Sequence, residues 1–218
     1  MSLFSIIDFL AVLAGALGGA AEAARDERKE YDIVGVVGLG LVSALGGGIT
    51  RDVLLNLGLP LALLDVRYLL FAFAGILLAL LLRAQVSRGV QNILLLIDAA
   101  ALGLYAVAGS TRAFDAGLGM LPAILLGAIT AAGGGAWRDV LSGRTPAVFQ
   151  RGSPYVLVAL CASGIYFGGR YTGAPNPYPT IAGAGAGFVL RLLALRLGWK
   201  TRAVSEFTRE GKDRPERT

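Results

Sequence analysis

Long apolar stretches separated by short charged connections account for most of the chain. Seven can be delimited, at residues 3–24, 33–48, 68–82, 93–110, 118–136, 155–169 and 178–197. A helix needs roughly 20 apolar residues to cross a hydrocarbon core about 30 Å thick, and several stretches are shorter than that. Continuing the second and fifth through Arg51-Asp52 and Arg138-Asp139 supplies the missing length. The pattern predicts an all-α polytopic membrane protein with seven transmembrane helices over residues 1–198, followed by a charged cytoplasmic tail over residues 199–218.

The composition favours the same class of protein. Hydrophobic residues make up 55% of the chain and charged residues 16%, and the mean hydropathy is +0.65. A soluble domain carries about 25% charged residues. The 31 glycines fit a membrane bundle, where small residues let helices approach closely. The first apolar stretch lacks a basic leader and exceeds the apolar core of a signal peptide, so we expect it to remain as the first span.

Several kinds of chemistry are disfavoured by the residues that are missing. The chain has no histidine and one cysteine, Cys161, which excludes a disulfide framework and argues against a metal site or an intramembrane enzyme. Cys161 lies inside an apolar stretch, so we expect a small buried core residue. The basic residues stand mainly between apolar stretches and in the tail, as topology signals do, so we expect no nucleic-acid partner.

The positive charges also predict an orientation. Fourteen Lys or Arg residues lie in the connections at 25–32, 83–92 and 137–154 and in the tail, against four in the alternate connections. Cytoplasmic loops carry an excess of Lys and Arg. The N-terminus is therefore expected outside and the C-terminus in the cytoplasm.

An internal repeat divides the chain into two halves. Residues 44–72 and 131–159 align without a gap at an offset of 87, with 11 identities in 29 positions, and both contain the segment Gly-Gly-Gly-x-x-Arg-Asp-Val-Leu. Asp8 and Asp98 form a further match at an offset of 90. Each half, about 3–82 and about 90–170, holds three predicted spans, and the stretch 178–197 is left over. Because three is odd, the second half must enter from the opposite side, which makes the halves inverted repeats.

The two glycine triplets are candidate pore residues. They are Gly46, Gly47 and Gly48 in the first half, and Gly133, Gly134 and Gly135 in the second. Each glycine inside a helix costs about 1 kcal/mol relative to alanine. We therefore expect broken or kinked helices beside an aqueous path, with tight helix–helix packing as the alternative.

Ionisable residues inside the apolar stretches are candidate functional groups. They form a predicted pore or gate network of Asp8, Asp98, Arg51, Asp52, Arg138 and Asp139. Adjacent helical positions point about 100° apart, so we expect Arg51 to meet a carboxylate of another span, Asp8 or Asp98, rather than its neighbour. A purely structural anchoring role is the alternative. Further polar residues expected at the same cavity are Glu22, Ser43, Tyr105 and Thr130.

The duplicated segments GGGITRDVLLN and GGGAWRDVLSGRTP, with an aspartate early in each half, resemble the prokaryotic trimeric intracellular cation (TRIC) channel family. Bacterial members are also labelled as a glycine-transporter-type membrane domain. The resemblance covers residues 3–198. It implies a homotrimer in the prokaryotic inner membrane, with one pore per protomer lined by the two glycine-kinked helices. The implied ions are monovalent cations, mainly K⁺ with Na⁺ also passing. We expect no other cofactor and leave a bound membrane lipid open.

A second function remains open on the residues alone. Inverted repeats with interrupted helices also suit alternating access, and an arginine can hold a substrate carboxylate. The alternative is a secondary transporter for a small zwitterion such as glycine.

Overall fold

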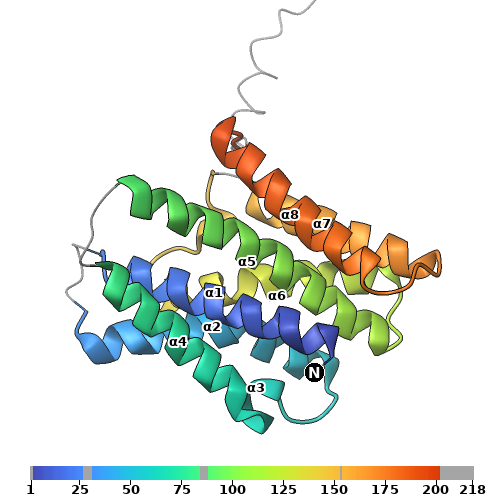
Figure 1. Ribbon diagram of the computed structural model, residues 1–218, viewed down its shortest axis with the longest axis horizontal. Helices are drawn as coiled ribbons and strands as arrows, with labels where there is room; N and C mark the ends of the chain where they lie inside the picture. The colour runs from blue at the N-terminus through green and yellow to red at the C-terminus, as the bar shows by residue number, and fades with distance from the viewer. Residues whose placement is uncertain (1, 27–30, 84–87, 153, 202–218) are drawn as a thin grey trace, which may run out of the picture.

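The chain folds into a bundle of helices. The computed structural model describes residues 2–26, 31–83, 88–152 and 154–201, and within these ranges it contains eight α-helices, one 3-10 helix and no strand (Figure 1). They are α1 (Leu3–Ala23), α2 (Ile33–Leu55), α3 (Leu61–Leu64), α4 (Val66–Arg83), α5 (Arg88–Asp115), α6 (Met120–Leu141), η1 (Ala147–Phe149), α7 (Tyr155–Tyr171) and α8 (Tyr178–Arg196). The predicted tail lies outside these ranges from residue 202 onward.

Most of the long helices in the described residues have the length and composition of membrane spans. Five are long and apolar enough to cross a membrane, namely α1, α2, α6, α8 and residues Asn92–Asp115 of α5, while α4 is apolar but shorter. Along α4 the exposed residues include Leu70, Phe73, Leu77 and Leu81, which follow helical spacing on one face. A continuous apolar face of this kind needs lipid or another subunit to cover it.

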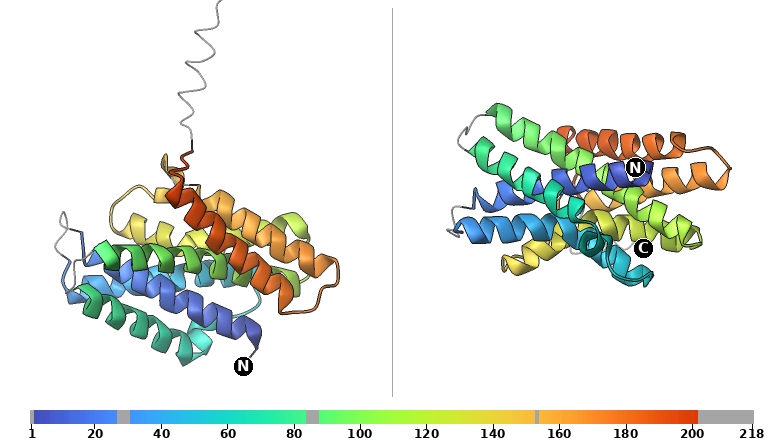
Figure 2. Two further views of the ribbon diagram at one scale, coloured as in Figure 1. Left: turned by 45° about the horizontal axis from the view of Figure 1, so that its top comes forward. Right: turned by 60° about the horizontal axis from the view of Figure 1, so that its bottom comes forward.

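Helices α1 and α5 form the middle of the bundle. Helix α1 packs on α2, α4 and α5, and α5 packs on α6, α7 and α8. Helix α2 contacts α6, which joins the first half of the chain to the second. In both views of Figure 2 the axes of the long helices are roughly aligned, and α8 lies alongside α7.

Helices α2 and α6 continue past the Arg-Asp pairs, as expected, to Leu55 and Leu141. Both helices are continuous through residues 46–48 and 133–135, so the expectation of a break at the glycine triplets is wrong, while a kink there stays a prediction. The triplets instead allow the two helices to touch. A β-carbon on Gly47 would overlap the Thr130 carbonyl oxygen, and one on Gly134 would overlap the Ser43 carbonyl oxygen. Contact between backbones offsets the poor helix propensity of glycine, and the packing alternative applies to these two positions.

The contact between α2 and α6 is symmetric: the repeat that relates the two halves exchanges its two sides. Adding the offset of 87 to 43 and 47 gives 130 and 134, so Gly47 on Thr130 and Gly134 on Ser43 are one contact made twice. The numbers increase in opposite directions, so the helices cross antiparallel. Within each half, packing also recurs: Gly19 lies against Ser43 in the first half, and Gly109 lies against Thr130 in the second. The two halves are therefore packed alike.

Two short helices were not predicted. Helix α3 begins after Pro60 and η1 after Pro146, where proline presets the backbone φ. An aspartate receives the first N–H of each: Leu61 N donates to Asp52 Oδ2 at 2.9 Å, and Ala147 N donates to Asp139 Oδ2 at 3.0 Å. Helices of three or four residues are too short for a hydrophobic period to reveal.

The expectation for Cys161 is wrong. Its side chain is exposed on α7 rather than buried. In a membrane helix an apolar residue can face outward as readily as inward, so an apolar stretch does not indicate which of its residues reach the core.

Candidate functional site

A cavity of about 1040 Å³ lies between the two halves of the chain. It is lined by residues of α1, α2, α5, α6, α7 and α8, and by the segment 144–152. The polar residues on its wall include Glu22, Ser43, Asp98, Tyr105 and Arg138. Of the polar residues expected at a cavity, Glu22, Ser43 and Tyr105 are therefore found there. Thr130 is not: it is buried, and its hydroxyl donates to the Leu126 carbonyl at 2.7 Å.

Charged residues are paired at the mouth of this cavity. Arg138 forms ion pairs with Glu22 of α1 and with its neighbour Asp139, the latter at 2.8 Å. Arg144 lies 3.2 Å from Glu22 and 3.7 Å from Asp26. The network ties the end of α6 to the end of α1 and pairs three carboxylates with two guanidinium groups.

A second charged pair lies on the cavity wall. Arg191 of α8 donates to Asp98 Oδ2 of α5 through Nε at 3.3 Å and through Nη2 at 3.2 Å. The guanidinium carbon also lies 4.7 Å from the centre of the Tyr155 ring, a cation–π distance. The helix outside the repeat therefore supplies the arginine that holds Asp98.

Tyr105 closes the inner end of the large cavity. Its hydroxyl donates to the Ala44 carbonyl at 2.7 Å, two residues before the first glycine triplet. Tyr105 also lines a second cavity of about 10 Å³, together with Asp8, Gly48 and Arg51. That volume is about the least that holds one water molecule. The second cavity therefore has room for about one water molecule.

A buried charged cluster fills the space beyond Tyr105. Arg51, 1% exposed, reaches both oxygens of Asp8 at 3.1 and 3.2 Å, and its Nε reaches Asp52 Oδ1 at 2.8 Å. The Tyr68 hydroxyl donates to Asp8 Oδ2 at 2.7 Å. The bidentate geometry is the strong form of an arginine–carboxylate contact. Arg112 lies 3.9 Å from Asp52 at the edge of the cluster, so the two carboxylates and the two guanidinium groups balance formally.

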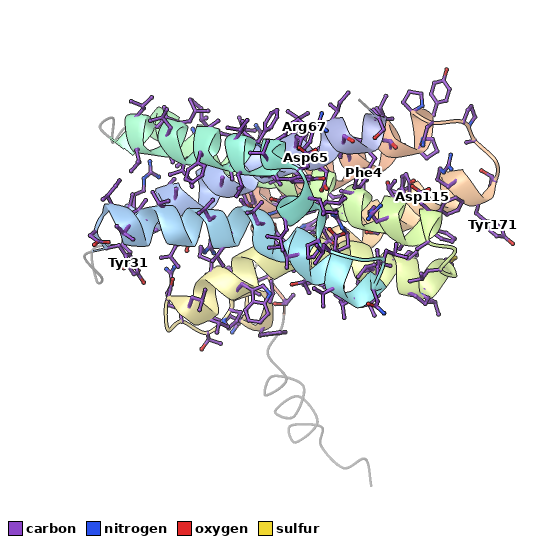
Figure 3. The ribbon with its side chains drawn as sticks, turned by 90° about the horizontal axis from the view of Figure 1, so that it is seen from below. Phe4, Tyr31, Asp65, Arg67, Asp115 and Tyr171 are labelled. Atoms are coloured by element: carbon purple, nitrogen blue, oxygen red, sulfur yellow. The ribbon has the colours of Figure 1, made fainter. Side chains whose placement is uncertain are left out.

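Phe4 covers the cluster on the side of the N-terminus. The guanidinium carbons of Arg51 and Arg112 lie 5.6 and 5.7 Å from the centre of its ring. Figure 3 shows Phe4 on the part of the molecule that carries Asp65 and Arg67, and far from Tyr31 at the opposite end. Here hydrogen bonds from Arg67 hold the pKa of Asp65 below its usual range.

The six predicted charged residues are thus divided between two places. Arg51 meets Asp8 on another helix, as predicted. The expectation that Arg and Asp of one pair do not face each other is wrong, because Arg51 contacts Asp52 and Arg138 contacts Asp139. An arginine side chain is long enough to fold back across the 100° between neighbours at the end of a helix. Asp98 binds neither of these arginines in the described ion pairs.

Sequence reasoning missed Tyr68, Tyr155, Arg191 and Phe4 as site residues. Tyr68 and Tyr155 are identical residues at equivalent positions of the repeat, and this could have marked them as site residues. Arg191 is a charge inside an apolar stretch and deserved the same weight as Asp98. Phe4 carried no signal, because an aromatic residue near the start of an apolar helix is ordinary.

Comparison with known proteins identifies a matching family model and several related membrane proteins. Residues 5–84 and 95–171 match the family model described as "Glycine transporter". A UPF0126 membrane protein of Deinococcus radiodurans is 36% identical over 196 residues, which is 90% of this chain and 86% of that protein. The UPF0126 inner membrane protein YadS of Escherichia coli K12 is 31% identical over 170 residues, or 78% and 82% of the two chains.

Solved structures of the same fold are TRIC channels. The TRIC orthologue from Rhodobacter sphaeroides is 31% identical with a TM-score of 0.81, covering 91% of this chain and all of that one. A structure describing conductance through TRIC cation channels is 31% identical with a TM-score of 0.78, covering 93% and 97%. These matches and the apolar helices define an α-helical multi-pass membrane protein. The chain belongs to the TRIC family, whose bacterial members share the glycine-transporter model.

Proposed function

We propose that the protein is a monovalent cation channel that prefers K⁺, with one pore in each protomer of a homotrimer. The observation that carries this proposal is the pair of cavities separated by Tyr105, one large and one of about 10 Å³. Together they form a path between the two halves that is blocked over a short distance. The solved relatives named as trimeric cation channels support both the ion class and the assembly.

The proposed topology is seven spans, arranged as two inverted three-helix repeats plus α8. The antiparallel crossing of α2 and α6 and the recurring glycine contacts support it. With the orientation inferred from the loop charges, in a prokaryotic inner membrane, the large cavity opens to the cytoplasm. The blocked end, with Phe4 and the Arg51 cluster, then faces outside.

The charges of the cluster are compatible with a cation path. An arginine alone would repel a cation, but Arg51 is held by Asp8 and Asp52 and presents no net positive charge. The third glycine of each triplet is placed for a lining role. A β-carbon on Gly48 or Gly135 would have no neighbour closer than 3.7 or 3.9 Å, and these residues border the small and the large cavity respectively. We therefore assign packing to Gly47 and Gly134, and the path to Gly48 and Gly135.

A transporter for glycine or a similar zwitterion is the second candidate. The description of the family model and the arginines of the large cavity favour it. In alternating access the two halves close opposite ends of the path in turn, and equivalent closing residues in the two halves would suit that exchange. Tyr105 closes one end, whereas the equivalent position at an offset of 90 is Gly15. This difference favours the channel.

The deciding experiment uses purified full-length protein. In a planar bilayer with a K⁺ gradient, the channel gives unitary currents that reverse toward the K⁺ equilibrium potential, and protein-free bilayers give none. Proteoliposomes are tested in parallel for uptake of labelled glycine. Saturable glycine uptake without unitary currents would overturn the channel assignment. Chemical cross-linking in the membrane should yield a trimer; a product that ends at the dimer contradicts the proposed assembly.

A further inference from the structure

Asp98 differs from the other carboxylates of the large cavity in how it is held. Glu22 lies between two guanidinium groups, those of Arg138 and Arg144. Asp98 is paired with Arg191 in the part of the chain that the structure describes, and both described bonds end on the same oxygen, Oδ2. Its side chain is 41% exposed, whereas that of Arg191 is 11% exposed. An ion pair that is partly exposed and uses one carboxylate oxygen contributes little stability.

The repeat shows what is unusual about this pair. In the first half, Asp8 is bound through both oxygens by Arg51 of the same half. The counterparts in the second half are Asp98 and Arg138, but Arg138 turns to Glu22 and Asp139 instead. The cation beside Asp98 is supplied by α8, which has no counterpart in the repeat. The carboxylate that the first half buries is therefore left on the cavity wall in the second half.

The position of Arg191 is fixed by more than Asp98. Its guanidinium stacks on Tyr155, the residue equivalent to Tyr68. Stacking and a rigid helix keep the charge near Asp98 when the ion pair loosens. A tethered guanidinium at this place competes with any mobile cation for the same carboxylate.

We propose that Asp98 is a binding site for a monovalent alkali cation on the wall of the large cavity, and that Arg191 is a built-in competitor that lowers its occupancy. The inference deepens the proposed channel function, because it names the residue pair that sets cation concentration ahead of the closed point. The exposed carboxylate, its one-sided pairing and the origin of its partner outside the repeat carry it. Removing the guanidinium should raise cation occupancy near Asp98 and leave the closed point at Tyr105 unchanged.

Conductance tests the competitor role. In about 10 mM KCl, where the Debye length is about 30 Å, Arg191→Gln should raise single-channel conductance by about two- to threefold, the effect of one unit charge at several ångströms. In about 1 M KCl, where the Debye length is about 3 Å, the difference should vanish. Arg191→Lys keeps the charge and should stay near wild type. Arg191→Gln combined with Asp98→Asn should lose the gain.

Arg196→Gln is the matched control. It removes the same charge from an exposed position on α8 that does not line the cavity. An equal gain in Arg196→Gln, or no gain in Arg191→Gln at low salt, overturns the proposal. If Arg191→Gln does not yield folded trimer, Arg191→Met preserves the apolar stem and replaces it.

Thermal unfolding tests ion binding without any current. A bound cation stabilises the folded protein by mass action, so Arg191→Gln should show a higher Tm in KCl than in choline chloride at equal ionic strength. The wild type should show a smaller difference, and the double variant with Asp98→Asn none. A K⁺-specific shift in a protein without unitary currents would keep the site and reject the channel. Equal Tm in both salts for Arg191→Gln rejects the site, whatever the currents show.

Discussion

Gly15 of α1 provides the space in which the Tyr105 hydroxyl of α5 lies, because a β-carbon at Gly15 would overlap that oxygen. The two residues stand at equivalent places in the two halves, separated by the same offset of 90 that relates Asp8 to Asp98. A phenol at one place and no side chain at the other makes the bundle asymmetric at its centre. In the proposed channel, Tyr105 closes the path through the hydrogen bond from its hydroxyl to the Ala44 carbonyl.

Tyr105→Phe removes this hydrogen bond and retains the ring. A hydrogen bond of this kind contributes about 0.5–1.5 kcal/mol, so we expect the closed state to lose about two- to tenfold in population relative to the open one. Single-channel open probability in planar bilayers measures it. Tyr178→Phe, at an exposed position on α8, is the control and should not differ from wild type. An unchanged open probability in Tyr105→Phe would mean that this bond does not hold the path shut.

Gly15→Ala tests the same closure from the other side. The added methyl group displaces Tyr105 from Ala44, so we expect an increase in open probability in the same direction as for Tyr105→Phe. Gly18→Ala on the same helix is the matched control, because a β-carbon there meets nothing within 4 Å. If the two alanine variants behave alike in bilayers, the contact between Gly15 and Tyr105 has no role in closure.

The glycine triplets should divide by position rather than act as a unit. Gly47→Ala and Gly134→Ala each place a methyl group against a carbonyl oxygen of the facing helix, and overpacking of this kind costs about 1–3 kcal/mol. We expect a lower Tm for both variants. Gly48→Ala and Gly135→Ala have room for the methyl group and should keep the Tm while reducing conductance. A similar loss of Tm in all four would contradict the assignment of Gly48 and Gly135 to the path.

Asp8→Asn should be strongly destabilising. It removes the bidentate partner of the buried Arg51, and breaking a buried pair costs about 3–5 kcal/mol. The Tm of the purified protein and its yield from the membrane report the effect. Asp65→Asn is the control, since it breaks an exposed pair with Arg67 that contributes little. Equal Tm values for the two variants would show that the cluster at Arg51 is not a stabilising element.

The apolar pattern predicted the positions of the long helices among the described residues, because long apolar stretches are local features of sequence. The geometry of a helix predicted that Arg51 meets a carboxylate of another span, Asp8 or Asp98, and the partner is Asp8. The pairing of Asp98 with Arg191 was not predicted, because Arg191 lies on α8, outside the repeat. The sequence also did not predict that the helices continue through the glycines. The cost of glycine is a local property, but it is offset by the contact of Gly47 with Thr130, which lies on a helix far along the chain.

The crossing of α2 and α6 has a mechanical consequence. Where Gly47 meets Thr130 and Gly134 meets Ser43, backbone lies directly on backbone, and no side chain is present that changes rotamer to let the helices part. We therefore expect the two helices to rotate about this contact more easily than they slide along each other. We also expect a displacement of α2 near Arg51 to reach α6 near Arg138 through this contact, so that the two ends of the proposed path respond together.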